Sequence, residues 1–358
     1  MSTAELWARL RQAGLVQGEL SEANGDRSPW FVRVMLGVAG WIGALFLLLF
    51  VGIGMKFIID SASASLVAGV VACAAAAVLF SKFSENDFAG QFGLAVSIAG
   101  QALILFGIAD ALGSKNVGPI ALLMVPVQAA LFWLLPSYVH RVWAAASGAC
   151  AVALGLADLG LFAFAPALVL VAFAWVWLKE FDFAKQGTLA RAGGYGLAIA
   201  AVVIAVMHGE LSLPAILDRP TPPLGGLIGL WIGAALTGAA LLWAVVQLLA
   251  REDVPLESPQ GKIALVGVII LAIATLKAPG IGPAAAVLVI GFANGNRVLA
   301  GLGILALLAY LSHYYYALQL TLLEKSAVLA ATGVALLAAR LALLRYWPAS
   351  KSEEVPHA

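Results

Sequence analysis

The sequence predicts an all-α protein, a polytopic bundle that crosses a lipid bilayer about twelve times with both termini in the cytoplasm. Composition, the length of the apolar runs and the placement of basic residues each support this prediction. Of the 358 residues, 63% are hydrophobic and 11% are charged, whereas a soluble domain carries about 25% charged residues. So few charges cannot cover the surface of a chain this long, so lipid must be the solvent over most of it.

Apolar runs of membrane-spanning length follow one another along the chain, separated by short polar connections. A spanning helix needs about 20 apolar residues. The expected spans are 33–56, 62–80, 88–110, 117–135, 141–157, 159–178, 189–207, 224–249, 260–277, 280–294, 297–317 and 322–346. Runs 141–157 and 280–294 are the weakest, and if either is re-entrant, or if two runs merge, the count falls to about ten or eleven.

The basic residues alternate as the positive-inside rule expects. With the N-terminus inside, fifteen of the 20 Lys and Arg residues fall on the inner side: Arg9, Arg11, Arg27, Arg33, Lys82, Arg141, Lys179, Lys185, Arg191, Arg251, Lys262, Arg297, Arg340, Arg345 and Lys351. The other five fall outside: Lys56, Lys115, Arg219, Lys277 and Lys325. An error of one helix in the middle would invert every later loop, so an even number near twelve is favoured.

Three regions follow from this pattern. Residues 1–32 form a cytoplasmic segment that is too polar for a signal peptide, 33–346 form the transmembrane domain, and 347–358 form a cytoplasmic tail. A short amphipathic helix is expected over 2–14, because Leu6, Trp7 and Leu10 share a face and Gly14 is a natural stop. It could lie on the membrane or the bundle, or dock another protein.

A faint internal repeat relates two six-helix halves, 33–178 and 189–346. Residues 117–125 resemble residues 281–289, and each stretch opens with a Gly-Pro pair, Gly118-Pro119 and Gly282-Pro283. Gly/Pro-interrupted segments at matching positions of a duplicated chain can mark a transporter's binding site. Chance similarity is the other explanation, since these residues are common in membrane helices.

Polar residues are costly in a membrane, so the few near the outer helix ends are candidates for a polar or charged site. His313 belongs to this set because imidazole can carry a proton or bind a ligand, although the tyrosines around it fit an interfacial belt. The set could respond to protons or cations through acids paired with lysines, or it could be ordinary wetted helix ends. The candidates are Asp110, Asp158, Lys277, His313, Glu324 and Lys325.

Small residues recur at every fourth position in one predicted helix, at Gly225, Gly229, Gly233 and Thr237. This is the close-packing pattern of membrane helix pairs. It predicts a helix–helix contact, either inside the chain or with a second subunit.

The sequence contains none of the motifs expected of several common classes of enzyme and binding protein. No phosphate-binding loop, zinc-protease motif, nucleophile elbow or dinucleotide fingerprint occurs. Cys73 and Cys150 lie in separate apolar segments with no CxxC spacing, so no disulfide framework, metal site or other cofactor is expected. A net charge of +1 without a dense basic run argues against a nucleic-acid partner.

Two stretches carry a resemblance to a known family. The run Tyr314-Tyr315-Tyr316-Ala317-Leu318-Gln319-Leu320-Thr321-Leu322-Leu323-Glu324-Lys325-Ser326, together with Pro29-Trp30-Phe31-Val32-Arg33-Val34, resembles a domain-of-unknown-function family of polytopic bacterial membrane proteins. The resemblance covers residues 29–346 and implies a bacterial inner membrane. Members are often encoded beside a small membrane-anchored protein with a GDYxxLxY signature. The resemblance supplies no activity, ligand or catalytic residue.

Three functions are therefore weighed. The first is a non-enzymatic multi-pass protein of the inner membrane that contacts lipids and acts with a small membrane-anchored partner. The alternative is a secondary transporter of a small solute, although the loop 81–88 does not match the charged motif of the major transporter superfamily. An intramembrane enzyme ranks last, with Asp158, His313, Glu324 and Lys325 as its candidate residues.

Overall fold

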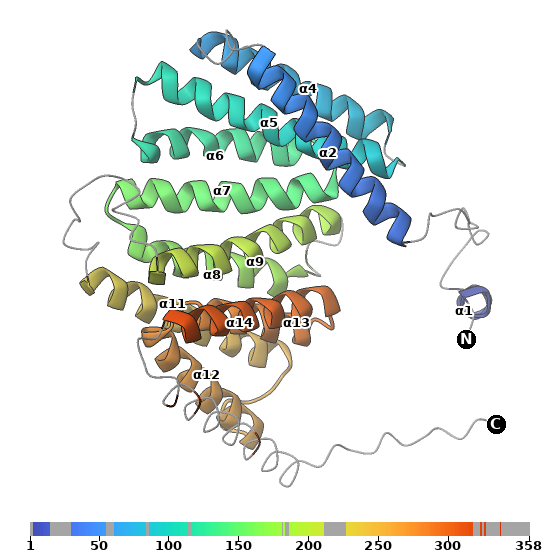
Figure 1. Ribbon diagram of the computed structural model, residues 1–358. Coiled ribbons are helices and arrows are strands. Elements are labelled where there is room, and N and C mark those ends of the chain that lie inside the picture. Colours follow the sequence, from blue (N-terminus) through green and yellow to red (C-terminus); the bar gives the residue numbers. More distant parts are fainter. Residues whose placement is uncertain are drawn as a thin grey trace. The chain divides into compact units, whose positions relative to one another are not determined.

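The computed structural model describes residues 3–14, 30–54, 61–83, 86–113, 116–180, 182, 186–210, 227–317, 323, 326 and 337. All regular secondary structure in these residues is helical (Figure 1). The predicted all-α class is therefore confirmed for the described part of the chain.

The chain divides into two compact units, and each is described by itself. Unit 1 comprises residues 1–115 and 133–140, and unit 2 comprises residues 116–132 and 141–358. Unit 1 contains α1 (Thr3–Gln12), α2 (Trp30–Gly54), α4 (Ala62–Lys82) and α5 (Asp87–Ala111). Helices α6 (Val117–Leu134) and α7 (Tyr138–Asp158) contribute residues to both units. Unit 2 contains η1 (Phe162–Phe164), α8 (Ala165–Leu178), α9 (Gly187–Glu210), α11 (Leu227–Arg251), α12 (Pro259–Lys277), α13 (Ile281–Ala293) and α14 (Arg297–Ala317).

Each predicted span from 33–56 to 297–317 has a helix in its place, and of the last, 322–346, the structure describes only residues 323, 326 and 337, which are helical. Seven helices in the described part are long and apolar enough to cross a membrane: α4, α5, α6, α7, α9, α11 and α12. Span 141–157, one of the two weakest predictions, belongs to this set as α7. The chain is thus a multi-pass membrane protein, while the count of twelve and the side of each terminus stay predictions.

Helices α8 and α13 are the shortest α-helices described in the predicted spans. Helix α8 has 14 residues and α13 has 13, so each is about 20 Å long against a hydrocarbon core of about 30 Å. Span 159–178 is broken because Gly160 takes a positive φ of 75° after α7 and the three-residue 3-10 helix η1 precedes α8. Pro166 then occupies the first turn of α8, where its missing N–H has no cost.

Glycines bring α4 and α5 into close contact in unit 1. A Cβ on Gly69 would lie 2.6 Å from the carbonyl oxygen of Gly100, and a Cβ on Gly100 would lie 2.7 Å from that of Gly69. Any larger residue would push the two backbones apart. Small residues at such crossings are typical of membrane helix pairs. In lipid no hydrophobic effect drives two helices together, so they associate through close backbone packing instead.

Helix α13 is the central helix of unit 2 and contacts α8, α9, α11, α12 and α14. Its middle is buried through Ala284, Ala285, Ala286, Val287 and Ile290. Figure 1 shows α14 running alongside α13, and their contact is close because a Cβ on Gly291 would lie 2.5 Å from the backbone nitrogen of Ala300. Residues 282–287 of this short helix are therefore enclosed by other helices, whereas Phe292 near its end is 83% exposed.

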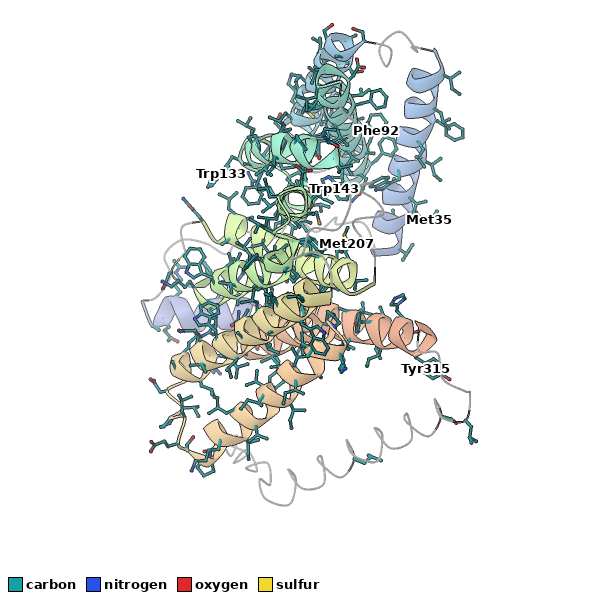
Figure 2. The ribbon with its side chains drawn as sticks, turned by 90° about the vertical axis from the view of Figure 1, so that its left-hand side faces the viewer. Met35, Phe92, Trp133, Trp143, Met207 and Tyr315 are labelled. Atoms are coloured by element: carbon teal, nitrogen blue, oxygen red, sulfur yellow. The ribbon has the colours of Figure 1, made fainter. Side chains whose placement is uncertain are left out.

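Large apolar side chains cover the outside of both units. Met35 and Trp133 stand out from the ribbon in Figure 2 and are 70% and 60% exposed. On α12 the exposed set includes Val266, Ile270 and Ile273, which recur at helical spacing. Apolar patches on this scale mark a surface that contacts lipid or protein rather than water.

Candidate functional site

A buried polar cluster in unit 1 joins α5 to the start of α7. His140 and Ser97 are fully buried, and Gln101 is 5% exposed. The Nε2 atom of His140 lies 2.9 Å from Ser97 Oγ and 3.1 Å from Gln101 Nε2. Gln101 Nε2 also donates to Ser97 Oγ at 3.2 Å. We call Ser97, Gln101 and His140 the His140 cluster.

Local structure explains how the His140 cluster forms. Ser97 and Gln101 are one turn apart on α5, so they share a face, and His140 lies in the first turn of α7. The amide nitrogen of Gln101 can only donate, so Nε2 of His140 accepts in this contact. The Phe80 ring closes one side, with its centroid 5.9 Å from that of the imidazole.

Sequence reasoning missed His140 as a site residue. Neither His140 nor its partners Ser97 and Gln101 are among the six site candidates taken from the sequence. A histidine directly before the apolar run 141–157 was a usable signal, because ionisable residues in membrane segments are rare and tend to be functional. Its partners could not be found, since Ser97 lies 43 residues away.

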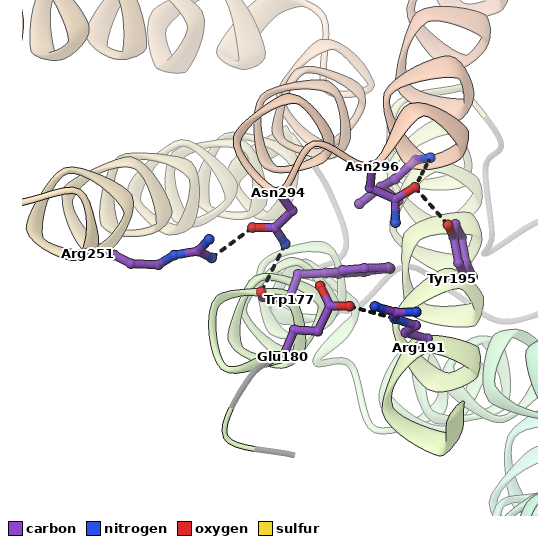
Figure 3. A network of polar contacts seen from close by, with 8 residues as sticks. Trp177, Glu180, Arg191, Tyr195, Arg251, Asn294 and Asn296 are labelled. Carbon is purple, nitrogen blue, oxygen red and sulfur yellow. Dashed lines mark hydrogen bonds and ion pairs between the residues drawn. The ribbon is translucent and has the colours of Figure 1, made fainter. Parts of the chain in front are cut away.

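A second polar network lies at one end of unit 2 and is centred on Asn294, the C-cap residue of α13 (Figure 3). Asn294 Oδ1 accepts a hydrogen bond from Arg251 Nη1 at 2.7 Å, and Asn294 Nδ2 donates to the backbone oxygen of Trp177 at 3.0 Å. We call this pair of contacts the Asn294 bridge. It ties together the C-terminal ends of α8, α11 and α13.

The Asn294 bridge provides hydrogen-bonding and charge partners for the C-terminal ends of helices. The last carbonyls of a helix have no intrahelical partner, and the helix dipole makes each C-terminus partly negative. Asn294 supplies a donor to α8, and Arg251 brings a positive charge to the junction. Arg251 also has a second partner, because its Nε lies 3.6 Å from Glu252 Oε1.

The network continues to α9 and α14. Tyr195 Oη donates to Asn296 Oδ1 at 2.9 Å, and the same oxygen accepts the backbone N–H of Leu299 at 3.1 Å in the first turn of α14. The Tyr195 ring meets the Trp177 ring edge-on, with centroids 5.1 Å apart. Helix ends that the sequence assigned to the inner side therefore meet at one end of unit 2.

An ion pair completes this end of unit 2. Arg191 Nε lies 2.6 Å from Glu180 Oε1, with the Arg191 side chain 60% exposed and the Glu180 side chain 11% exposed. The carboxylate of this pair is therefore largely shielded from solvent, whereas the guanidinium is not.

The structure places the six predicted site residues as follows. Asp158 packs directly against Gly118 at the start of α6. Lys277 Nζ lies 4.9 Å from the centroid of the Trp231 ring. Asp110 is exposed near the end of α5 in unit 1, and His313 is exposed on α14. Glu324 and Lys325 lie outside the described residues.

The small-residue stripe lies on α11. Gly229, Gly233 and Thr237 are buried, whereas Gly225 lies outside the described residues. Thr237 Oγ1 donates to the carbonyl oxygen of Gly233 at 2.7 Å, so this hydroxyl finds its acceptor within α11. Helix α11 contacts η1, α8, α9, α12 and α13.

The described residues offer no group of three or more His, Cys, Asp or Glu side chains arranged to hold a metal ion. Cys73 and Cys150 are both free thiols. Hydrogen bonding and helix contact are thus the chemistry that the two polar clusters present.

Comparison with known proteins gives one family. A family model described as a domain of unknown function (DUF4401) matches residues 29–346. No curated protein and no solved structure matches the chain. The match spans every predicted membrane segment but leaves α1 outside it. The chain belongs to the DUF4401 family.

Proposed function

We propose that this chain is a secondary transporter of a small solute, located in a bacterial inner membrane and working without covalent chemistry. The observation that carries the proposal is α13, a 13-residue helix whose residues 282–287 are buried among other helices of unit 2. Spanning helices are longer, and a short helix inside a bundle has at least one end at membrane depth. Transporters place their binding sites at such discontinuous helices.

The start of α13 supports this reading. The turn between α12 and α13 is largely buried, since Ala278 is 4% exposed and the Tyr310 ring packs onto Gly280. Backbone without helical hydrogen bonds is tolerated at membrane depth only inside protein or beside a water-filled cavity. Thr275 lies at the same place, because its Oγ1 is 2.6 Å from where a Cβ on Gly282 would be.

The repeat in the sequence points to the same segment. Gly118-Pro119 opens α6 and Gly282-Pro283 opens α13, and both glycines are buried. Each glycine has a side chain packed closely against it. Asp158 packs against Gly118, and Thr275 packs against Gly282. Equivalent helix openings in two halves of a chain are the pattern from which transporter sites are built.

Ligand-dependent stability tests the proposal. The purified full-length protein is unfolded by heat against a panel of ions, metabolites and lipids. A ligand that binds only the folded protein stabilises it by about 2.7 kcal/mol at a hundredfold excess over its dissociation constant. A saturable shift supports transport and names the solute class, whereas a flat response over a broad panel counts against it.

Two matched variants place the site. Thr275 and Thr237 are both buried threonines whose Oγ1 donates to the carbonyl four residues earlier at 2.7 Å. Thr275→Val alters the start of α13, and Thr237→Val makes the same chemical change on α11. A site at α13 predicts that only Thr275→Val weakens the ligand shift. Equal weakening would place the site elsewhere.

A component that works with a small membrane-anchored partner is the second candidate. It is favoured by α1, a helix outside the family match with Glu5, Arg9 and Arg11 exposed. Mild solubilisation of the native membrane should then recover a small membrane protein at one copy per chain. Loss of that protein on Trp7→Ala substitution would assign the contact to α1, and failure to recover any stoichiometric partner would count heavily against this candidate.

The absence of covalent chemistry has its own test. Asp158, His313, Glu324 and Lys325 are the candidates from which an intramembrane enzyme would draw its residues. Replacing each by alanine in the native host should leave the phenotype of the chain intact. A lost phenotype in a variant that still folds would revive the enzymatic hypothesis.

A further inference from the structure

His140 is a fully buried ionisable side chain at the point where the chain leaves unit 1. It is the last residue of the stretch 133–140, which belongs to unit 1, and the chain enters unit 2 at Arg141. The imidazole contacts Ser97 and Gln101 of α5 at 2.9 and 3.1 Å. The His140 cluster therefore fastens the connection between α6 and α7 to α5 within unit 1.

A proton on His140 would change the contact with Gln101. The amide nitrogen of Gln101 donates, and Nε2 of His140 accepts from it only while this ring nitrogen carries no proton. An imidazolium carries a proton on both ring nitrogens and accepts no hydrogen bond. Gln101 would then have to turn its amide oxygen toward the ring or move away from it.

The groups packed around the ring from α4 and α5 supply no negative charge. Ser97 and Gln101 are uncharged, and so is the Phe80 ring of α4, whose centroid lies 5.9 Å from that of the imidazole. Cys73 of α4 adds a thiol, which donates to the backbone oxygen of Ser97 at 3.8 Å. Burial disfavours the charged form of a group unless an opposite charge lies close to it.

On α7 the charged residue next to His140 is Arg141. Its Nε donates to the backbone oxygen of Phe132 at 3.1 Å. Arg141 is a cation, so it supplies no negative charge to the ring either. These surroundings favour a neutral His140.

We propose that the His140 cluster is a proton-sensitive contact, which holds the α6–α7 connection on α5 while His140 is neutral and weakens when His140 takes up a proton. Histidine in an unperturbed setting gains its proton at about pH 6.5, so mild acidification is the signal. The proposal is independent of solute transport at α13, because Ser97, Gln101 and His140 all lie in unit 1.

The pH dependence of reversible unfolding by denaturant tests the proposal on the full-length protein in mixed micelles. Stability should fall as the pH falls, because the unfolded chain then binds a proton at His140 that the folded cluster excludes. With an unfolded pKa of about 6.5, the folding constant should fall by about tenfold between about pH 7.5 and about pH 5.5.

His140→Gln removes the proton site and keeps an acceptor, because a glutamine oxygen can face Gln101 but takes up no proton in this range. This variant should lose the tenfold fall. His313→Gln is the matched control, since His313 is exposed on α14 and belongs to unit 2. The control should keep the full fall of the parent protein.

Gln101→Glu tests the same contact in the opposite direction. A carboxylate at this position would pair with the protonated ring, so the folded cluster would hold a proton that the unfolded chain gains only at about pH 6.5. The folding constant of this variant should therefore rise on acidification over the same range.

Each result decides for or against the proposal. An equal fall in the parent protein and in His140→Gln overturns it, because the acid response then arises elsewhere. A fall in Gln101→Glu as steep as that of the parent overturns it as well, and this variant carries the test if His140→Gln does not fold. A parent protein whose folding constant changes by less than about twofold over this range overturns it without any variant.

Discussion

The side chain of Asp158, the last residue of α7, packs directly on the Cα of Gly118 in the first turn of α6. A Cβ on Gly118 would occupy the space that the Cβ and Cγ of Asp158 fill. The Asp158 Cβ is fixed by its own backbone and cannot swing away. The carboxylate also lies near a helix N-terminus, where a negative charge is favourable.

Gly118→Ala should therefore destabilise the protein by about 2 kcal/mol, the usual scale for overpacking a rigid contact. The check is the midpoint of thermal unfolding in detergent. Gly267→Ala is the matched control, because that glycine is inside α12 and a Cβ there meets no atom within 4 Å. The control should be stabilising by about 0.5–1 kcal/mol. Equal midpoints for the two variants would contradict the Gly118 contact.

His140→Ala should lower stability by roughly 3 kcal/mol. The change removes the acceptor for Ser97 and Gln101 and leaves these buried donors with each other, which costs about 1–3 kcal/mol for each unsatisfied group. The same substitution at exposed His313 should stay within about 0.5 kcal/mol. The midpoint of thermal unfolding is measured for both variants. A His140→Ala midpoint equal to that of His313→Ala would be incompatible with the His140 cluster.

Two substitutions of Tyr195 should separate its hydroxyl from its ring. Tyr195→Phe loses only the hydrogen bond to Asn296 and should cost about 1 kcal/mol. Tyr195→Ala also loses the packing against Trp177 and should cost about 3–5 kcal/mol. Chemical or thermal unfolding measures both. If the two variants are equally stable, the edge-on ring contact contributes nothing.

Lys277 and Trp231 should show a small coupling energy. A cation over an exposed indole is worth about 0.5–1 kcal/mol, so a double-mutant cycle of Lys277→Gln with Trp231→Leu should return a value in that range. A second cycle, of Lys277→Gln with Asp158→Asn, tests the predicted network of acids and lysines. Coupling in the second cycle alone would favour that network over the indole contact.

Helix positions were largely predictable because hydrophobic length is a local property of the sequence. The runs 62–80 and 260–277 became α4 and α12 with ends within two residues of the expected ones. The break in 159–178 was harder to foresee, since it depends on the positive φ of Gly160 and on the turn that η1 makes. The shortness of α13 was partly foreseen, as 280–294 was among the weakest runs.

The polar clusters were much less predictable, because they depend on which helices meet. The partners of Asn294, Trp177 and Arg251, are 117 and 43 residues away from it in the sequence. Charge alone led the sequence analysis to the outer helix ends. The hydrogen-bonded clusters described above lie instead at His140 and at helix ends that the sequence assigned to the inner side, and no spacing in the sequence links their members.

Solute uptake into proteoliposomes tests the central claim most directly. The full-length protein is reconstituted, and the solute class that stabilises it is offered in labelled form with empty vesicles as the control. Transport predicts saturable uptake above the empty vesicles, and an altered rate in Thr275→Val but not in Thr237→Val. Uptake equal to that of empty vesicles for every stabilising solute would contradict the transport function.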